Sequence, residues 1–346
     1  RRTSQLVQLE QGLVVNILTH GNTVVSAGDI VKLDIPYSAA FKTTKNEKND
    51  RFYKGMFFVK RLRHDFDFSN KKNIRVHKYG PHLFHTNNEK VVSFIKKHGE
   101  WIEYKHKVKA MLNDGRYVTL PVNKLTKEIV GEENIIETFY RPYSEKMWNI
   151  KLEELSPTIF GRVPIRDDEN EFYFPNDKYQ LIPKNGYTDF IKNILNHPNI
   201  KVKLSKMFNY SMEENFFHVF NSMPIDEYYK FKFGELPYRS IKFHTIDIPV
   251  PKLFPVATVN FTNKGPYTRV TEWKNIPNHG INEIYTTITY EEPCDYKENN
   301  NEKFYPVEDL KGENRDLYKK YNLIKNDKTT FIGRLGLYVY FDMDQA

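Results

Sequence analysis

The stretch that decides the fold is VHKYGPHLFHT, residues 76–86. Three histidines, His77, His82 and His85, lie within nine residues around Gly80 and Pro81, with aromatic residues on both sides. Imidazole rings on a tight turn suit either a metal ion or a planar cofactor. No set of cysteines or carboxylates lies nearby at ligand spacing. The segment therefore favours a turn that faces a planar cofactor, and we expect no metal.

Length and composition bound the class of protein. The chain has 346 residues, enough for two or three domains with a core, and 39% of them are hydrophobic, which excludes a disordered chain. No apolar run approaches the roughly 18 residues that span a bilayer, so we expect no membrane partner. A single cysteine, Cys294, forms no internal disulfide, which favours a reducing, cytoplasmic location.

The positive charge is concentrated at one end of the sequence. Residues 1–72 carry 13 Lys and Arg against 7 Asp and Glu, which is most of the formal net charge of +8. Such an excess can attract nucleic acid or an acidic partner. An ordinary solvated surface is the simpler reading, so we expect no nucleic acid partner.

Residues 1–72 have the pattern of a small antiparallel β domain. Apolar residues alternate at 13–17 and again at 31–35, and a third strand is expected at 55–62. The segment resembles the small β-barrel of phage baseplate hub proteins. That resemblance implies a role in assembly, possible homo-oligomers and no chemistry.

Helices and strands alternate from residue 73 onward. Asn88 and Glu89 predict the start of a helix that ends at Gly99. Further helices are expected at 132–140 and 187–195. Strands are expected at 107–112, 116–121 and 328–332. The pattern predicts a mixed α/β fold with mixed sheets and a small helical substrate part at about 126–200.

Two other groups of residues can carry chemistry. The stretch FYRPYSEKMW, residues 139–148, is an aromatic cluster suited to stacking on a base or sugar, or simply to packing a helix end. Four arginines lie near turns, and guanidinium groups bind diphosphates through several donors. Taken singly, each is as consistent with a surface ion pair. They are Arg162, Arg166, Arg239 and Arg269.

Ordered motifs over residues 73–346 resemble UDP-galactopyranose mutase, a family of flavoenzymes. The motifs are HKYGPHLFHTNN, LPVN, YRPYSEKMW, RVPIRDD, PKNGYTDFIKNILNHPNIKV, PYTRVTEWK, FYPV and FIGRLGLYVYFDMD. The resemblance implies bound FAD, active when reduced, and UDP-galactose as the substrate. In that family flavin N5 attacks the anomeric carbon and displaces UDP. The sugar ring then opens and recloses as a furanose.

The resemblance also implies the site residues. Those implied to be catalytic are His82, Arg166 and Arg269. Those implied to bind substrate are Phe139, Tyr140, Tyr143, Trp148, Arg166, Tyr179, Arg239, Arg269, Tyr305 and Tyr340. Those implied to bind the cofactor are Tyr79, Gly80, Pro81, His82, Gly333, Arg334, Tyr340, Asp342 and Met343.

The sequence departs from the family at its start. Family members begin with a strand, a Gly-x-Gly-x-x-Gly turn and a helix that holds the FAD pyrophosphate. This sequence contains no such motif, and residues 1–72 occupy its place. We therefore expect a mutase-type domain that follows a phage-like β module. The alternative is a baseplate or tail protein with an inactive, sugar-binding mutase-like region.

Overall fold

The computed structural model describes residues 30–33, 55–58, 74–155, 164–281 and 283–345. The chain divides into two compact units, Arg1–Asn70 and Lys71–Ala346. In the first unit, strands β1 (Ile30–Leu33) and β2 (Gly55–Phe58) pair antiparallel, with Ile30 opposite Phe58. They lie within two of the segments expected to be strands. The rest of the expected β domain lies outside the described residues, so its resemblance to a phage hub stays a prediction.

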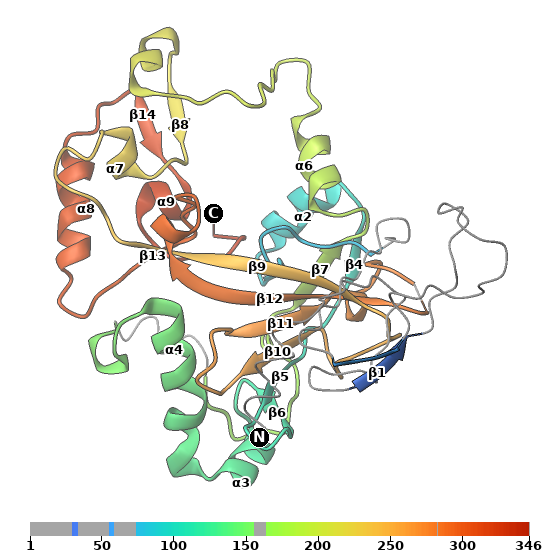
Figure 1. Cartoon of the computed structure of the whole chain (residues 1–346). Coiled ribbons are helices and arrows are strands. Elements are labelled where there is room, and N and C mark those ends of the chain that lie inside the picture. The colour runs from blue at the N-terminus through green and yellow to red at the C-terminus, as the bar shows by residue number, and fades with distance from the viewer. Residues whose placement is uncertain (1–29, 34–54, 59–73, 156–163, 282, 346) are drawn as a thin grey trace, which may run out of the picture. The chain divides into compact units, whose positions relative to one another are not determined.

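A mixed seven-stranded sheet forms the centre of the second unit (Figure 1). Its order is β13-β9-β12-β11-β10-β5-β6, and all neighbours are antiparallel except β10 and β5. Strands β9 and β12 are its longest strands and pair with each other. In chain order the strands are β5 (Val108–Met111), β6 (Tyr117–Leu120), β9 (Tyr238–Ile248), β10 (Thr258–Phe261), β11 (Arg269–Glu272), β12 (Thr286–Asp295) and β13 (Tyr305–Pro306).

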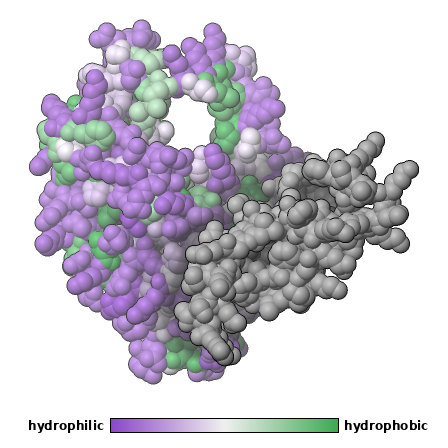
Figure 2. Space-filling view, in the orientation of Figure 1, coloured by the Kyte–Doolittle hydropathy of each residue, from purple (hydrophilic) through white to green (hydrophobic). Residues whose placement is uncertain are grey.

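Two smaller sheets complete the strands. The first has the order β3-β7-β4, with β7 antiparallel to both neighbours. The second pairs β8 and β14 in parallel. The strands are β3 (Phe84–Thr86), β4 (Trp101–Glu103), β7 (Tyr179–Pro183), β8 (Val219–Asn221) and β14 (Thr329–Phe331). Figure 2 shows a largely hydrophilic surface, with hydrophobic side chains gathered around the gap between the β8/β14 sheet and α6.

The helices are short. The α-helices are α2 (Glu89–Lys97), α3 (Lys124–Val130), α4 (Arg141–Trp148), α6 (Tyr187–Leu195), α7 (Ile225–Tyr228), α8 (Glu313–Leu323) and α9 (Gly333–Leu337). The 3-10 turns are η1 (Glu132–Asn134), η3 (Leu152–Glu154), η4 (Tyr210–Asn215), η5 (Trp273–Asn275) and η6 (Tyr296–Glu298). None of the described helices is long and apolar enough to cross a bilayer.

Helix α2 shows how local sequence sets an element. The Asn88 side chain accepts hydrogen bonds from the backbone N–H groups of Lys90 and Val91, which satisfies donors at the helix start. Val92 and Ile95 are buried on one face. The predicted start of this helix is confirmed, and so are the predicted helix at 187–195 and the strands at 107–112, 116–121 and 328–332.

The helix predicted at 132–140 is wrong in type. Residues 132–134 form a 3-10 turn, and Ile136–Tyr140 form a π-helical turn (η2) that runs directly into α4. Ile135, Phe139 and Tyr140 are buried in the core cluster built on β5 and β6. Packing of these three side chains overrides the ordinary α-helical period. The region expected at 126–200 also contains β7, which belongs to a sheet.

Candidate active site

One row of residues across the central sheet carries a buried ion pair. Strand register places Arg269 of β11 opposite Glu291 of β12, and Glu291 opposite Phe243 of β9. Arg269 Nε lies 2.7 Å from Glu291 Oε2. The Glu291 side chain is only 1% exposed, whereas that of Arg269 is 26% exposed. The arginine therefore has one side on the carboxylate and another side toward solvent.

The two partners perturb each other's pKa values. Burial is the largest single influence on the pKa of Arg269 and lowers it, but the combined attraction of Glu291, Tyr143 and Tyr305 raises it above its usual value. Burial raises the pKa of Glu291, and Arg269 opposes that rise. Glu291 Oε1 has no hydrogen-bond partner among the described residues. Most buried acceptors have a partner, so this oxygen could accept a hydrogen bond from a bound molecule.

Aromatic side chains lie beside this pair. Tyr143 and Trp148 of α4 lie in one cluster with Tyr305 and Tyr340. The rings of Tyr305 and Tyr340 are stacked at 5.6 Å, and Trp148 meets Tyr305 edge-on at 6.3 Å. Burial raises the pKa of Tyr143 to about 12, with Arg269 and Glu291 among the charges that act on it. We call Arg269, Glu291, Tyr143, Tyr305 and Tyr340 the Arg269 site.

Arg334, at the start of α9, lies over two of these rings. Its guanidinium carbon is 4.2 Å from the Tyr340 ring centre and 5.6 Å from that of Tyr305. Its Nε donates to the Phe341 carbonyl at 2.8 Å, which fixes the chain that carries Tyr340. Gly333 has φ +72°, a left-handed conformation in which glycine is not strained. Arg334 and Tyr340, which were both predicted to bind the cofactor, thus lie together at the Arg269 site.

The histidine turn lies against the same row. Gly80 has φ +83°, and a Cβ there would lie 3.1 Å from Phe243 Cε1 and 3.2 Å from Glu291 Oε1. Only glycine allows the backbone so close to Glu291. His82 donates from Nδ1 to the Gly80 carbonyl at 2.9 Å, and partial burial of its ring lowers its pKa. His82 is thus neutral at physiological pH, with Nε2 unprotonated.

Arg239 has a structural role, because its side chain bonds to backbone carbonyl groups. Its Nε donates to the Met147 carbonyl at 2.8 Å and its Nη2 to the Lys146 carbonyl at 3.3 Å. These bonds satisfy carbonyl groups at the C-terminal end of α4. Strand pairing places Tyr305 opposite Arg239. Arg239 therefore fixes the end of α4 that carries Trp148, next to the Arg269 site.

Arg166 makes its side-chain contacts within its own loop. It is buried, and its guanidinium donates to the carbonyls of Asn170 and Phe172 within its own loop. Its predicted contact with a diphosphate stays a prediction. The other arginine of that motif, Arg162, lies outside the described residues.

Tyr179 is also separate from the site. Its hydroxyl donates to Glu89 at 2.7 Å, and its ring packs against the α2 side of the β3-β7-β4 sheet. Tyr173 does lie near Tyr143, because it is among the groups that act on the pKa of Tyr143. The predicted role of Tyr179 in substrate binding stays a prediction. Tyr173 also packs against the cluster that contains Phe139 and Tyr140. Phe139 and Tyr140 are buried in that cluster, about one turn before Tyr143.

The remaining predicted residues lie at the edges. Tyr79 is exposed and meets Phe304 at 5.8 Å, and Pro81 is half-buried next to it. Met343 is exposed. Asp342 lines a surface pocket of about 500 Å³ near the end of β3. The other residues that line it are His85, Thr86, Asn87, Asn88, Asp177, Asp344 and Gln345.

His85 is paired rather than open. Its Nδ1 lies 2.6 Å from Asp177 Oδ2, and its ring stacks on Phe174 at 3.6 Å. Among the described residues, no group of three His, Cys, Asp or Glu side chains could hold a metal ion.

Glu291 was missed by sequence reasoning. It is 22 positions from its partner in the sequence, and no motif marks it. Only the β11/β12 register brings the two together. Its strand, TTITYEEPCD, holds three threonines and a second glutamate beside it, so nothing in the sequence singles Glu291 out.

Comparison with known proteins agrees with this geometry. A family model for UDP-galactopyranose mutase matches residues 138–340. A probable UDP-galactopyranose mutase of Klebsiella pneumoniae is 31% identical over 309 residues, 79% of this chain and 79% of that protein. This chain belongs to the UDP-galactopyranose mutase family. The predicted resemblance is confirmed.

Other members of the mutase family differ in their sugar. A dTDP-fucopyranose mutase of Escherichia coli is also 31% identical, over 319 residues, 79% of this chain and 83% of that protein. A crystal structure of a reduced UDP-galactopyranose mutase has a TM-score of 0.56 and 14% identity, and covers 74% of this chain and 77% of its own. That likeness confirms the mixed α/β fold. The family is one of isomerases acting on nucleotide sugars.

Proposed function

We propose that this chain catalyses the flavin-dependent interconversion of UDP-galactopyranose and UDP-galactofuranose. The observation that carries the proposal is the Arg269–Glu291 pair beside the stacked rings of Tyr305 and Tyr340. A nucleotide sugar has a charged diphosphate and a sugar ring with an apolar C–H face. A guanidinium group next to aromatic faces is suited to bind both.

Arg269 neutralises the diphosphate in this proposal. When the bond to the sugar breaks, UDP departs with additional negative charge on its phosphate oxygen. A fixed guanidinium near that oxygen stabilises the charge as it develops. Glu291 holds the guanidinium in place and keeps it ionised. Its carboxylate and the Arg269 group therefore act together.

The aromatic residues orient the sugar. Tyr305, Tyr340 and Trp148 form one aromatic wall, in which the two tyrosine rings stack on each other and Trp148 meets Tyr305 edge-on. A sugar held on these faces is kept in one orientation, which turns a bimolecular step into an oriented one. The buried Phe139 and Tyr140, one turn earlier, support the end nearer the base.

The described residues fit the ring end of a flavin. Gly80 leaves room for close approach of the backbone to Glu291, and the His82 ring is neutral with an unprotonated Nε2. Arg334 is an additional donor beside Tyr340. The pyrophosphate end lacks its usual Gly-x-Gly-x-x-Gly motif in this sequence. When bound in its reduced form, the flavin supplies the nucleophile for the anomeric carbon.

The experiment starts with the visible spectrum of the purified chain with and without added FAD. The reduced protein is then incubated with UDP-galactopyranose, and UDP-galactofuranose is measured by chromatography. We expect flavin absorbance and turnover, both dependent on reductant. A protein that stays colourless with added FAD and gives no product would reject the proposal.

A parallel incubation separates substrates. Because a dTDP-fucopyranose mutase is as similar as the mutase of Klebsiella pneumoniae, dTDP-fucopyranose is the second substrate to test. The ratio of kcat/KM for the two nucleotide sugars then identifies the preferred one. A strong preference for dTDP-fucopyranose would keep the reaction type and replace the sugar.

A further inference from the structure

Three histidines form a continuous hydrogen-bonded chain that ends at the 80–82 turn. His279 Nδ1 lies 2.8 Å from the Pro277 carbonyl oxygen. His279 Nε2 lies 2.9 Å from His77 Nε2. His77 Nδ1 accepts the backbone N–H of His82 at 3.1 Å. The chain thus connects a loop near residue 279 to the turn that contacts Glu291.

The partners fix the proton on each ring. His77 Nδ1 receives a backbone N–H, so it carries no proton, and the neutral ring is protonated at Nε2. His279 Nδ1 faces a carbonyl oxygen, which only accepts, so this ring is protonated at Nδ1 and accepts at Nε2. The bond between the two rings therefore runs from His77 to His279. Every donor in the chain meets an acceptor.

This arrangement holds a geometry and does not conduct protons. The chain ends at a backbone amide, which neither gains nor loses a proton under ordinary conditions. An extra proton on either ring would put two donors face to face. Burial lowers the pKa of His77 to about 3 and also lowers that of His279, so both rings stay neutral.

The surroundings keep both rings in place. His279 is 1% exposed, and the Trp273 ring lies parallel to it at 6.2 Å. The His77 ring lies 5.1 Å from the same Trp273. The backbone N–H of Arg75 donates to the His279 carbonyl at 2.6 Å. Two distant segments, near residues 76 and 278, are thereby joined.

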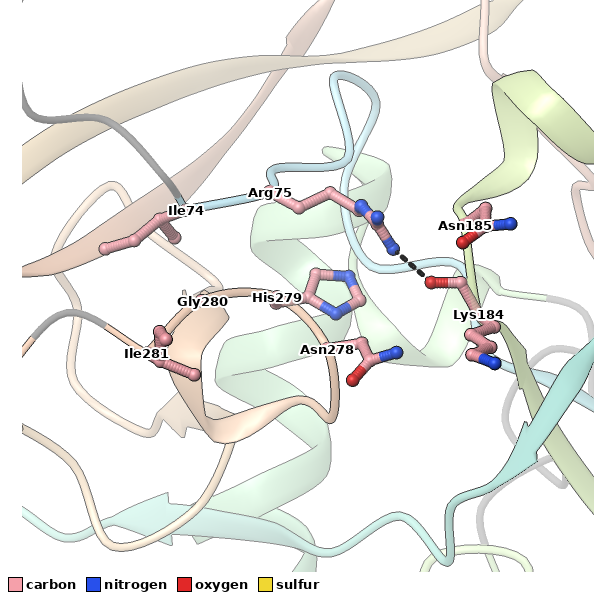
Figure 3. A pocket seen from close by; sticks show the side chains of 8 residues that line it. All are labelled: Ile74, Arg75, Lys184, Asn185, Asn278, His279, Gly280 and Ile281. Atoms are coloured by element: carbon pink, nitrogen blue, oxygen red, sulfur yellow. Dashed lines mark hydrogen bonds between the residues drawn. The ribbon is translucent and has the colours of Figure 1, made fainter.

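His279 also forms the inner wall of a surface pocket of about 490 Å³ (Figure 3). Arg75 and Lys184 lie on the opposite side of this pocket, where Arg75 Nη1 donates to the Lys184 carbonyl at 2.8 Å. The His279 side chain itself is buried, and none of its hydrogen bonds involves a residue of the Arg269 site, so its replacement leaves the contacts of that site in place.

The 80–82 turn depends on this support. Its other anchors are the Tyr187 hydroxyl, which donates to the His82 carbonyl at 3.0 Å, and the turn's own bond from the Gly80 N–H to the His77 carbonyl at 3.2 Å. The bond to His77 Nδ1 is the one anchor we find for the N–H of His82 among the described residues. Loss of that bond leaves the N–H free to turn.

We propose that His77 and His279 are positioning residues that hold the 80–82 turn in place above the Arg269–Glu291 pair. The effect on catalysis rests on the function proposed above, whereas the hydrogen-bonded chain itself does not. His77 lies in the motif that resembles the family, and His279 lies outside every motif. The pairing of the two is a feature of this fold that the motifs do not predict.

The first test reads the tautomers directly. The full chain, labelled with ¹⁵N at histidine, is studied without flavin by long-range ¹H–¹⁵N correlation. We expect the protonated nitrogen at Nε2 in His77 and at Nδ1 in His279. The opposite tautomer in either ring would overturn the proposal, whatever the activity of the protein.

The second test uses variants. In His279→Ala the His77 Nε2–H loses its acceptor, so we expect faster exchange of that proton and a shifted amide resonance of His82. We also expect kcat to fall about fivefold to tenfold with a smaller change in KM, the size expected for one lost positioning bond. In His279→Gln the side-chain carbonyl accepts the same proton, so most of the rate should return. His197→Gln, at an exposed position, is the control.

The outcomes separate the two proposals. If His279→Ala leaves the His82 amide resonance and kcat unchanged, the positioning role is rejected. If His279→Gln is as impaired as His279→Ala in both readouts, the hydrogen bond is not what matters, and the role is again rejected. If the unsubstituted chain shows no turnover, the proposed function fails, while the tautomers and the His82 resonance still decide whether the chain of bonds exists.

Discussion

Two groups of tyrosines surround a cation in this fold, and they differ in whether the cation can be reached. In the Arg269 site the arginine is 26% exposed and pairs with one carboxylate. In the second group Lys303 is 2% exposed, with Nζ 2.8 Å from Glu227 and 3.6 Å from Asp226. Its Nζ also lies 4.6 Å from the Tyr238 ring centre and 4.7 Å from that of Tyr296. We call these five residues the Lys303 cluster.

The partners of the Lys303 cluster are all internal. The Tyr238 hydroxyl donates to the Leu335 carbonyl and the Tyr296 hydroxyl to Glu235. Asp226 also accepts the backbone N–H of Leu236. Its cation is neutralised by its own carboxylates and serves the core. Similar residue types therefore surround both cations, and solvent access distinguishes the Arg269 site, to which we assign binding, from the Lys303 cluster, to which we assign packing.

Arg269→Ala should have the largest effect. It removes the charge that we assign to the diphosphate and leaves Glu291 buried without a partner, so kcat/KM should fall about 10³-fold, or about 4 kcal/mol. Arg269→Lys keeps the charge without the planar fork and should be intermediate. Steady-state kinetics on protein checked for folding by circular dichroism measures both. Turnover of Arg269→Ala within tenfold of the unsubstituted chain would contradict the comparison.

Lys303→Met should act on stability and spare the site. It leaves the buried Asp226 carboxylate without its cation, and breaking such a pair costs about 3–5 kcal/mol. Urea unfolding measures the loss, and KM of the remaining folded protein should be unchanged. The double variant Lys303→Met with Asp226→Asn should recover part of the stability. A changed KM with normal stability would mean that the Lys303 cluster takes part in binding.

Gly80→Ala tests the close approach at the Arg269 site. A Cβ at φ +83° is strained and also meets Phe243 and Glu291, so we expect about 2 kcal/mol of lost stability and a fall in kcat of about 10²-fold. Gly115→Ala is the control, because φ there is +86° and nothing lies within 4 Å of the added atom. It should lose stability by strain alone. Equal kinetic effects in the two variants would show that contact with Glu291 is unimportant.

Acid should weaken the fold through a buried histidine beside the Arg269 site. His106 is 4% exposed, and burial lowers its pKa to about 3, with Arg269 contributing. Between its unfolded pKa near 6.5 and pH 3, the unfolded chain binds a proton that the folded chain does not. Stability should therefore be full above pH 6.5 and fall by up to about 1.4 kcal/mol per pH unit below it.

The contribution of His106 is isolated by difference. Unfolding free energies of the unsubstituted chain and of His106→Asn are compared from pH 7 to pH 4, so that carboxylates cancel. The gap between them should change with pH by this amount. A gap that does not depend on pH would mean that His106 is protonated in the fold.

Tyr179→Phe should have the smallest effect. Its hydroxyl bonds to Glu89, whose side chain is 64% exposed, and such surface bonds contribute about 0–1 kcal/mol. Tyr173→Phe, next to Tyr143, should raise KM several-fold. Kinetics of both variants under the same conditions decides between them. A larger rise in KM for Tyr179→Phe would restore the placement expected from sequence.

Local signals in the sequence were reliable where they depended on neighbours. Asn88 and Glu89 predicted the start of α2, because capping is decided within four residues. The motif that contains Tyr143 and Trp148 marked residues that lie in one cluster with Tyr305 and Tyr340, and their role in substrate binding stays a prediction. Glu291 and His279 were not predictable, since each gains its role from strand or loop pairing across more than 20 residues. The sequence also could not show that Tyr179 packs on the β3-β7-β4 sheet while Tyr173 lies near Tyr143, because that difference depends on strand pairing.

The π-helical turn before α4 sets the rotational phase of the site. A π turn holds one residue more than an α turn, and each α-helical residue rotates the next by about 100°. The extra residue therefore determines the angle between the core-facing Ile135 and the site-facing Tyr143. Deleting exposed Glu137 would restore the α period and rotate Tyr143 and Trp148 by about 100° away from Arg269. The direction in which α4 presents Tyr143 and Trp148 thus depends on the length of the preceding turn as well as on the identity of these residues.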